Sequence, residues 1–524
     1  MAGDDPRLRY RQDAVRAVVR DVLGDDTVEL DDNFFTAGGD SMRSLQVIEG
    51  LARRGLAIEV ADVLTAQTLG QLARCARVPV GPEAAGAGSP ASGPALAPPA
   101  GASAIRPASG LQVGMLFLTE MAGPSTGIYV DFCGVRVSGA VEPGALRTAL
   151  ARVVARHESL RSYFDLASYP VAAQIVLPHA TVAPEWSALG ERDDARAVIA
   201  RWRQQVVDEG IDTAAAPPLR CHVGTAPDHF WLTLATHHSV LDGWSFTRLM
   251  VDLLLHYDAA MGGTTAELPD IPSGGGAEFV RLERKAINSP AAQRYWRRHT
   301  EGAPRPVPGA EVARASRQLV APLHEPAWAG LTRTAAALQV PVKSLCLAAH
   351  ARAVGSWRGA AEVVTGLVTN GRPEIDGADL LVGLFLNTVP LALRTGGGWP
   401  EIARAALDAE REMYPYRRYP LATMTSDAGG PLFDVTFNFT HLHVVGELER
   451  LASVAVAGWW TEDVATFPVM VDVFTEDPML GTGAMVSYDP DQVSPTAAQA
   501  LLDELRAALL DASTAAVPAG SSGE

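Results

Sequence analysis

The chain has few cysteines and no cluster of potential metal ligands. Its four cysteines, Cys75, Cys133, Cys221 and Cys346, lie far apart, and none belongs to a CxxC pair. Structural zinc sites need cysteine or histidine ligands at short, regular spacing. We therefore expect no metal site, and reduced, mostly buried thiols in a cytoplasmic protein.

Long apolar runs and an excess of basic charge are also missing. No apolar stretch reaches the length of about eighteen residues that a membrane-spanning helix needs. Residues 1–30 carry charges throughout and lack the apolar core of a signal peptide. The net charge of −17 disfavours nucleic-acid binding, which requires a basic surface. We expect a monomeric protein that binds neither membranes nor nucleic acid.

What the chain does contain divides it into unequal parts. Its 524 residues exceed a single hydrophobic core. Apolar residues at helical spacing over Arg11–Leu23 and Met42–Arg54 predict a small all-α bundle at residues 8–78. Residues 79–105 are mostly proline, alanine, glycine and serine, which predicts a flexible linker.

The remaining sequence alternates strand-like and helical runs, which predicts an α/β fold. This part is also too long for one core, so we expect two lobes, 106–275 and 276–515, dividing near the glycine-rich Ser273–Gly276. A disordered tail at 516–524 should follow. The predicted strands are Gly134–Val137, Phe230–Ala235, Val363–Thr369, Leu432–Asn438 and Val469–Phe474.

One short motif lies inside the helical bundle. Residues 32–41 follow the pattern DxFFxxGGDS and end directly before the helix expected at Met42. Ser41 would stand at a helix N-terminus, where free N–H groups and the helix dipole favour an anion such as a phosphodiester. The alternative interpretation is an ordinary capping serine.

A second motif, HHxxxDG at residues 237–243, joins a predicted strand to a predicted helix. His238 would lie beside that helix N-terminus and could accept a proton from an attacking amine or hydrogen-bond to it. The N–H groups of Gly243 and Trp244 could donate to an oxyanion. His237 points to the opposite side of the strand, so we favour a structural role for it.

Asp242, in the same motif, is expected to be buried beside the strand-to-helix connection. A buried carboxylate needs a cationic or hydrogen-bonding partner. Two arginines, Arg161 and Arg372, are the candidates for this structural ion pair.

The first motif resembles the attachment site of peptidyl carrier domains in nonribosomal peptide synthetases, and the second resembles the HHxxxDG signature of their condensation domains. Further segments resemble other motifs of the condensation family, and with the carrier motif they account for nearly all of the chain. They are Ser109–Phe117, Arg156–Phe164, Asn370–Pro373, Val382–Thr388 and Phe433–Phe439.

The resemblance implies a four-helix carrier bundle followed by two lobes like chloramphenicol acetyltransferase, with His238 inside a tunnel. It implies 4′-phosphopantetheine on Ser41, with Gly39 and Asp40 in the attachment site. The expected partners are a phosphopantetheinyl transferase, neighbouring adenylation domains and a downstream aminoacyl carrier. The expected reaction forms a peptide bond, with His238, Gly243 and His237 as catalytic candidates.

Three other functions stay open at this point: epimerisation of the carrier-bound residue, ester formation with a hydroxyl acceptor, and non-catalytic docking of another enzyme. No adenylation or thioesterase module fits the remaining length, so we expect a piece of a larger assembly line, with a stand-alone didomain as the alternative. The HHSVLDGWS sequence resembles domains that accept a D-configured donor, but no epimerase unit separates the carrier from the condensation unit, so we favour an achiral or L-configured donor.

Overall fold

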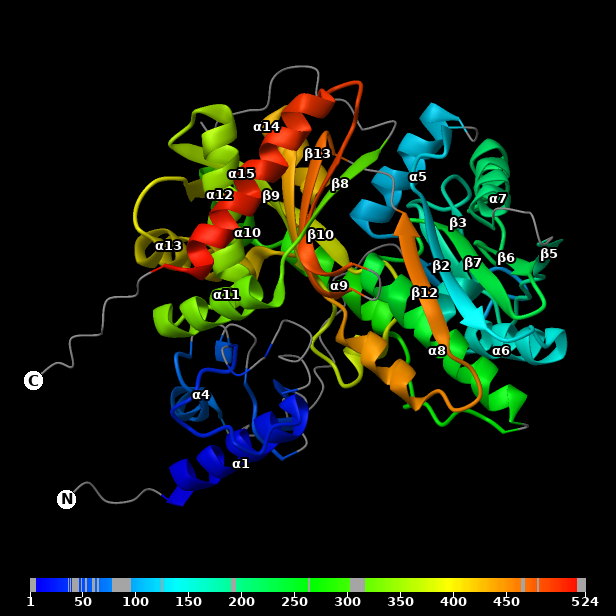
Figure 1. The fold of residues 1–524 in the computed structure, drawn as a ribbon, viewed down its shortest axis with the longest axis horizontal. Helices are drawn as coiled ribbons and strands as arrows, with labels where there is room; N and C mark the ends of the chain where they lie inside the picture. Colours follow the sequence, from blue (N-terminus) through cyan, green and yellow to red (C-terminus); the bar gives the residue numbers. More distant parts are fainter. Residues whose placement is uncertain are drawn as a thin grey trace, which may run out of the picture.

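The computed structural model describes residues 6–35, 37, 39, 47–48, 50–51, 54–58, 62–63, 66–77, 96–123, 126–189, 195–262, 264–301, 316–462, 467–477 and 480–515. Two lobes stand side by side, and the N-terminal helical unit lies beneath them (Figure 1). Asp40, Ser41 and most of the helix expected at Met42–Arg54 lie outside the described residues.

The N-terminal unit is helical, as the sequence predicts. It contains α1 (Pro6–Leu23) and α4 (Leu69–Cys75), and Thr68 caps α4 by accepting the Gln71 N–H at 3.2 Å. Val15 and Val19, one helical turn apart, are fully buried, so one face of α1 supplies the core of the unit.

The first lobe is built on a five-stranded sheet of order β12-β2-β7-β6-β5. Helices α6 and α8 pack on one face of this sheet and α7 on the other. A separate small sheet has the order β1-β4-β3. The elements are β1 (Ala104–Pro107), α5 (Gly110–Ala122), β2 (Val130–Ser138), α6 (Pro143–Arg156), η2 (Glu158–Arg161), β3 (Ser162–Asp165), β4 (Ala173–Val176), β5 (Glu185–Ala188), α7 (Ala195–Glu209), β6 (Leu219–Thr225), β7 (His229–His237) and α8 (Gly243–Met261).

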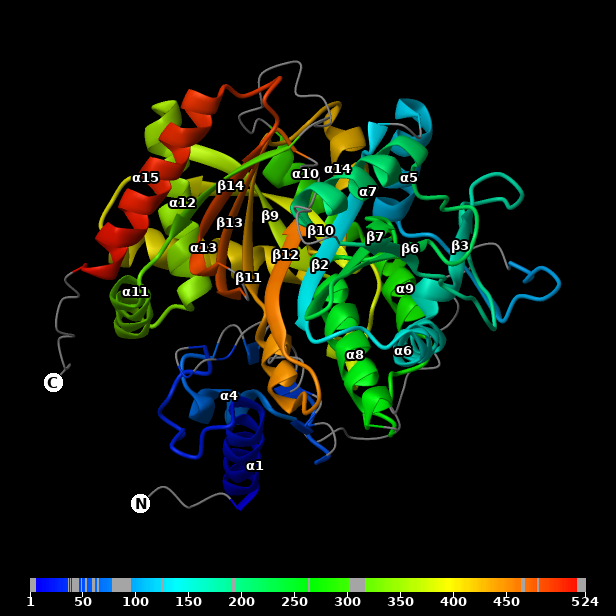
Figure 2. The ribbon, with the colours of Figure 1, turned by 45° about the vertical axis from the view of Figure 1, so that its right-hand side comes forward.

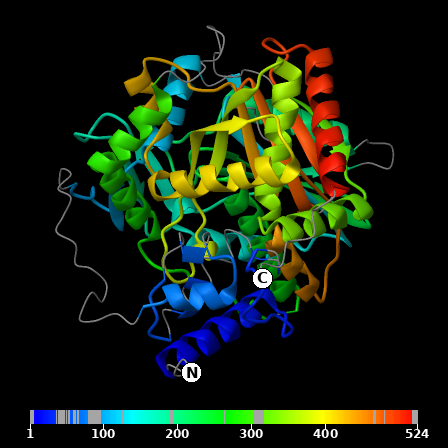
Figure 3. The ribbon, with the colours of Figure 1, turned by 90° about the vertical axis from the view of Figure 1, so that its left-hand side faces the viewer.

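The second lobe is built on a six-stranded sheet of order β10-β9-β11-β13-β14-β8. Helices α11, α12, α13 and α15 cover its outer face, and Figure 3 looks onto this layer, with α15 in red and α13 in yellow. The elements are α9 (Gly275–Ile287), α10 (Pro290–Thr300), β8 (Arg317–Pro322), α11 (Glu325–Leu338), α12 (Val342–Arg358), β9 (Glu362–Asn370), η3 (Ala378–Leu380), β10 (Leu386–Arg394), α13 (Trp399–Met413), η4 (Tyr414–Tyr416), α14 (Leu421–Ala428), β11 (Val435–His441), η5 (His443–Arg450), β12 (Val456–Glu462), β13 (Val469–Asp477), β14 (Gly481–Tyr488) and α15 (Pro495–Ser513).

One strand leaves the second lobe and joins the sheet of the first. β12 pairs antiparallel with β2, and Figure 2 shows the two strands side by side, in orange and cyan. Trp460 lies opposite Gly134, where a Cβ atom would stand only 2.2 Å from the indole Nε1, so the pairing requires glycine there. The expected division into 106–275 and 276–515 did not include this exchange, because strand pairing between distant segments leaves no local signal.

Three sequence-based boundaries shift in the structure. The expected linker, 79–105, ends inside β1, because Ala104 and Ile105 already pair with β4. The strand expected at Leu432–Asn438 begins at Val435. The division expected near the glycine-rich Ser273–Gly276 falls at the start of α9, where a Cβ on Gly275 would stand 2.5 Å from Leu381.

The lobes also meet where α9 approaches the start of α5. The buried Glu283 carboxylate accepts the Gly110 N–H at 2.8 Å. Burial raises the pKa of Glu283 to about 7, and the Gly110 hydrogen bond and nearby Arg284 offset only part of that effect. Because the folded state holds this proton more tightly than the unfolded state, stability falls as pH rises from about 4.5 to about 7.

We expect Glu283→Gln to stabilise the protein at pH 8 by up to about 3 kcal/mol and to leave stability unchanged near pH 4. Denaturant unfolding at the two pH values measures this difference. The control is Glu278→Gln on the same helix, whose partly exposed carboxylate pairs with Arg281 at 2.6 Å. An equal gain in stability at both pH values would contradict the raised pKa of Glu283.

Candidate active site

His238 follows the last residue of β7 and faces a large cavity between the lobes. Its backbone N–H donates to the Tyr129 carbonyl at 2.7 Å, which continues the β2–β7 pairing by one residue. Its ring Nδ1 contacts the carboxylate of Asp131 on β2. The His238 side chain is 20% exposed and the Asp131 side chain 7%. An ionised Asp131 accepts only, so Nδ1 carries the proton in this contact.

His237 lies on the other side of the strand, away from the cavity. Its Nδ1 is 2.8 Å from the Ser239 hydroxyl and its Nε2 is 2.9 Å from the Thr119 hydroxyl. Burial, followed by the proximity of His238, lowers the pKa of His237 to about 3. A neutral histidine with both ring nitrogens bound to hydroxyls fits the favoured structural role and gives no support to a catalytic one.

Asp242 anchors the start of α8. Its carboxylate accepts the Ser245 N–H at 2.7 Å and the Phe385 N–H at 3.1 Å, and it pairs with Arg372 at 3.0 Å. Both charged side chains are almost completely buried. Of the two predicted partners, Arg372 is the one that the structure brings to Asp242.

Arg161 does not take part in this site. Its guanidinium donates to the Leu177 carbonyl in the first lobe. An arginine is a suitable residue type to pair with Asp242. Arg161, however, lies at the end of the η2 turn, which directs its side chain toward β4 and the loop that follows β4.

Gly243 and Trp244 place their N–H groups at the free end of α8 beside His238. The first N–H groups of a helix have no partner within the helix, and here the Asp242 side chain takes only the third, that of Ser245. Gly243, Trp244 and His238 all line the same cavity. The expected pair of oxyanion donors therefore opens onto the space that a substrate would occupy.

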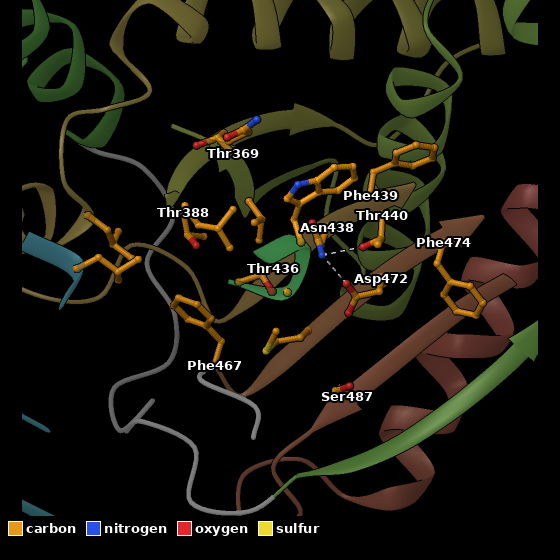
Figure 4. A pocket seen from close by; sticks show the side chains of 18 of the residues that line it. Thr369, Thr388, Thr436, Asn438, Phe439, Thr440, Phe467, Asp472, Phe474 and Ser487 are labelled. Atoms are coloured by element: carbon orange, nitrogen blue, oxygen red, sulfur yellow. Dashed lines mark hydrogen bonds between the residues drawn. The ribbon is translucent and has the colours of Figure 1, made fainter. Parts of the chain in front are cut away.

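The cavity has a volume of about 1130 Å³ and reaches from the N-terminal unit to the second lobe. Phe35 and Gly39 of the N-terminal unit line it together with His238. Figure 4 shows part of its wall on the strands of the second lobe. Among the described residues, no group of three or more histidine, cysteine, aspartate or glutamate side chains could hold a metal ion.

Gly39 also explains part of the first motif. A Cβ atom at this position would stand 2.4 Å from the Phe34 ring, and the Gly39 N–H donates to the Phe34 carbonyl at 2.9 Å. Phe34 is buried in the helical unit. The aromatic residue and the glycine of the motif thus require each other, and Phe35 is left to line the cavity.

Ile48 brings the N-terminal unit against the second lobe. It packs on a cluster that includes Phe279, Leu381 and Phe385, with Trp244 at its edge. Trp244 follows the HHxxxDG motif directly, packs on the same cluster and lines the cavity together with His238.

We expect Asp242→Asn or Arg372→Met to cost about 3–5 kcal/mol of stability, because each leaves an uncompensated buried charge. The double variant should recover much of this loss, since it removes both charges. Denaturant unfolding of the three variants measures the coupling. Additive losses in the double variant would contradict the pairing.

Comparison with known proteins identifies the family of the chain. A family model described as "Condensation domain" matches residues 103–514, and one described as "Phosphopantetheine attachment site" matches residues 13–76. The AMB antimetabolite synthetase AmbE of Pseudomonas aeruginosa is 34% identical over 452 residues, which cover 82% of this chain but 21% of AmbE. The chain thus spans about a fifth of that relative.

Solved structures share the fold at low sequence identity. The first condensation domain of the CDA synthetase superposes with a TM-score of 0.66 at 18% identity, covering 79% of this chain and 98% of that domain. The X-domain in complex with OxyB from teicoplanin biosynthesis superposes with a TM-score of 0.61 at 18% identity, covering 80% of this chain and 96% of that one. No described helix is long and apolar enough to cross a membrane. The chain belongs to the condensation-domain family, the acyltransferase-type enzymes of nonribosomal peptide synthetases, and carries a phosphopantetheine attachment domain in front of it.

Proposed function

We propose that this chain transfers an acyl or peptidyl group from Ser41 to the amine of an aminoacyl group on a downstream carrier, and so forms a peptide bond. One observation carries the proposal: Phe35 and Gly39, next to Ser41 in the sequence, line the same cavity as His238. A group attached near these residues could reach the transfer site without leaving the protein.

The cofactor expected from the attachment domain fits this arrangement. Phosphopantetheine on Ser41 would supply a thiol that carries the acyl group as a reactive thioester. The cavity beside Phe35 and Gly39 has about 1130 Å³ for such an arm and its cargo. A phosphopantetheinyl transferase must attach the group, and neighbouring adenylation domains must supply the acyl groups.

The chain's own residues would then position the amine and the developing charge. His238, with its Nδ1 proton held by Asp131, would use the other ring nitrogen to bind the amine or accept its proton. The N–H groups of Gly243 and Trp244 would donate to the oxyanion, helped by the α8 dipole. Asp242 and Arg372 would hold these groups in place.

The alternatives use the same fold. The X-domain from teicoplanin biosynthesis, which shares this fold, forms a complex with OxyB, so the fold alone is compatible with docking. Here His238 and Gly243 line the cavity, and the buried Asp242 anchors the helix end between them, which favours catalysis. Epimerisation and ester formation differ from the proposal in their products, so the same assay separates them.

The central experiment loads Ser41 with an acyl-pantetheine and adds an aminoacyl carrier in trans. Intact-protein mass spectrometry should show loss of the acyl group from Ser41 and a peptide on the acceptor. Inversion of the donor residue without transfer would indicate epimerisation, and transfer to hydroxyl acceptors alone would indicate ester formation. Donors ending in glycine or an L-residue should react at least as fast as D-ended donors.

Two variants test the residue roles in this assay. Ser41→Ala should prevent loading, and His238→Ala should load normally but transfer about 10²–10⁴-fold more slowly. His179→Ala, an exposed histidine outside the cavity wall, is the matched control. A normal transfer rate in His238→Ala would contradict the proposed catalytic role of this histidine.

We expect Asp131→Asn to slow transfer by about 10²-fold, because an asparagine can donate to Nδ1 and so favour the wrong ring tautomer. Asp131 acts here as a positioning residue, so its effect should vanish when His238 is already alanine. Single-turnover rates of the two single variants and the double variant measure this coupling. An equal slowing in both backgrounds would mean that Asp131 acts only on the fold.

A further inference from the structure

The inner face of the six-stranded sheet forms one wall of the cavity, and the half-buried side chain of Asp472 on β13 lies in this wall. On β13, Val471 and Val473 point into the helical core, while Asp472 between them faces the cavity. Asn438 lies directly opposite Asp472 on the parallel strand β11. Figure 4 shows the two side chains pointing toward each other from this wall.

Among the described residues, Asn438 is the one polar partner of Asp472. The Asn438 amide nitrogen donates to the Asp472 Oδ1 at 2.8 Å and also to the Thr440 hydroxyl at 3.1 Å, so both of its N–H groups are in use. Within the part of the chain that the structure describes, no other donor and no cation contacts the Asp472 carboxylate. The Asp472 carboxylate therefore presents acceptor oxygens to the cavity, and among the described residues only the Asn438 amide donates to it.

The other neighbours of Asp472 are apolar. Met485 lies opposite it on β14, and Met470 and Phe474 lie two residues away on the same face of β13. These surroundings raise the pKa of Asp472 to about 6, with the Asn438 hydrogen bond acting in the opposite direction. At pH 7 to 8 the carboxylate is still mostly ionised, which leaves a negative charge in an apolar wall.

The lysine, arginine and histidine side chains that line the cavity already have carboxylate partners. Lys343 pairs with Glu410 at 2.7 Å, and Arg372 pairs with Asp242 at 3.0 Å. His441 contacts Glu476 at 3.0 Å. A partly buried carboxylate normally requires a cation or several hydrogen-bond donors. In this cavity a bound substrate can supply the cation.

We propose that Asp472 binds a cationic group, an ammonium or a guanidinium, on one of the two substrates that occupy the cavity. This inference rests on the proposed function and names its substrate class: an acyl or aminoacyl group with a basic side chain or a free amine. An ammonium offers three N–H donors and no acceptor, which complements the acceptor oxygens of Asp472 and Asn438.

The test compares ornithine, norvaline and glutamate in two series. In the first, each residue ends the donor on Ser41; in the second, each is the aminoacyl acceptor. In one series the wild type should prefer ornithine over norvaline by about 10- to 100-fold, the contribution of a charge-assisted hydrogen bond in a dry site. The series that shows the preference identifies which substrate carries the cation.

Two matched variants separate Asp472 from the general charge of the cavity. Asp472→Asn keeps the size of the side chain and an acceptor for Asn438, and should abolish the preference for ornithine while norvaline reacts at the wild-type rate. Asp477→Asn removes another carboxylate that lines the cavity, at the end of β13, and should retain the preference. Equal preferences in the wild type and Asp472→Asn would overturn the inference.

A binding measurement keeps this test independent of the reaction. Butylammonium, titrated calorimetrically, should bind the wild type and Asp477→Asn but not Asp472→Asn. Equal binding to all three proteins would overturn the inference. Absence of norvaline transfer in the wild type would instead count against the proposed condensation activity, and the calorimetry would still report on Asp472.

Discussion

The buried ion pair of Asp242 and Arg372 is the constraint on which the active site depends. It lies at the point where α8 begins, and Asp242 also accepts the N–H groups of Ser245 and Phe385. Burial of both charges is costly, and only close pairing with full hydrogen bonding offsets that cost. Because the partners come from different lobes, the pair fixes the orientation of α8 and with it the positions of Gly243 and His238.

The parts of the site that lie within one continuous motif could be predicted from the sequence. The strand-to-helix change around residues 237–243 is a local signal, and the structure has β7 ending at His237 and α8 beginning at Gly243. The partner of Asp242 needed more than local information. Arg161 and Arg372 were equally suitable by residue type, and only the packing of the second lobe against α8 selects Arg372.

The other parts of the site depend on pairing between strands that are distant in the sequence. No short window of a single sequence indicates such pairing. Asp131 reaches His238 because β2 and β7 pair in one register, and Asp472 meets Asn438 because β11 and β13 are parallel neighbours. Both acids interrupt apolar runs, which marks them as unusual residues without indicating what they contact. The all-α and α/β parts were confirmed, whereas the placement of β12 was missed for the same reason.

The exchange of β12 also determines how this enzyme can be recombined with its relatives. A chimera joined near residue 275 would combine the β2 of one parent with the β12 of the other. Its seam would then run through a sheet rather than a loop, and a parent with any side chain in place of Gly134 would collide with Trp460. Functional hybrids should therefore inherit residues 456–462 together with the first lobe, as one discontinuous building block.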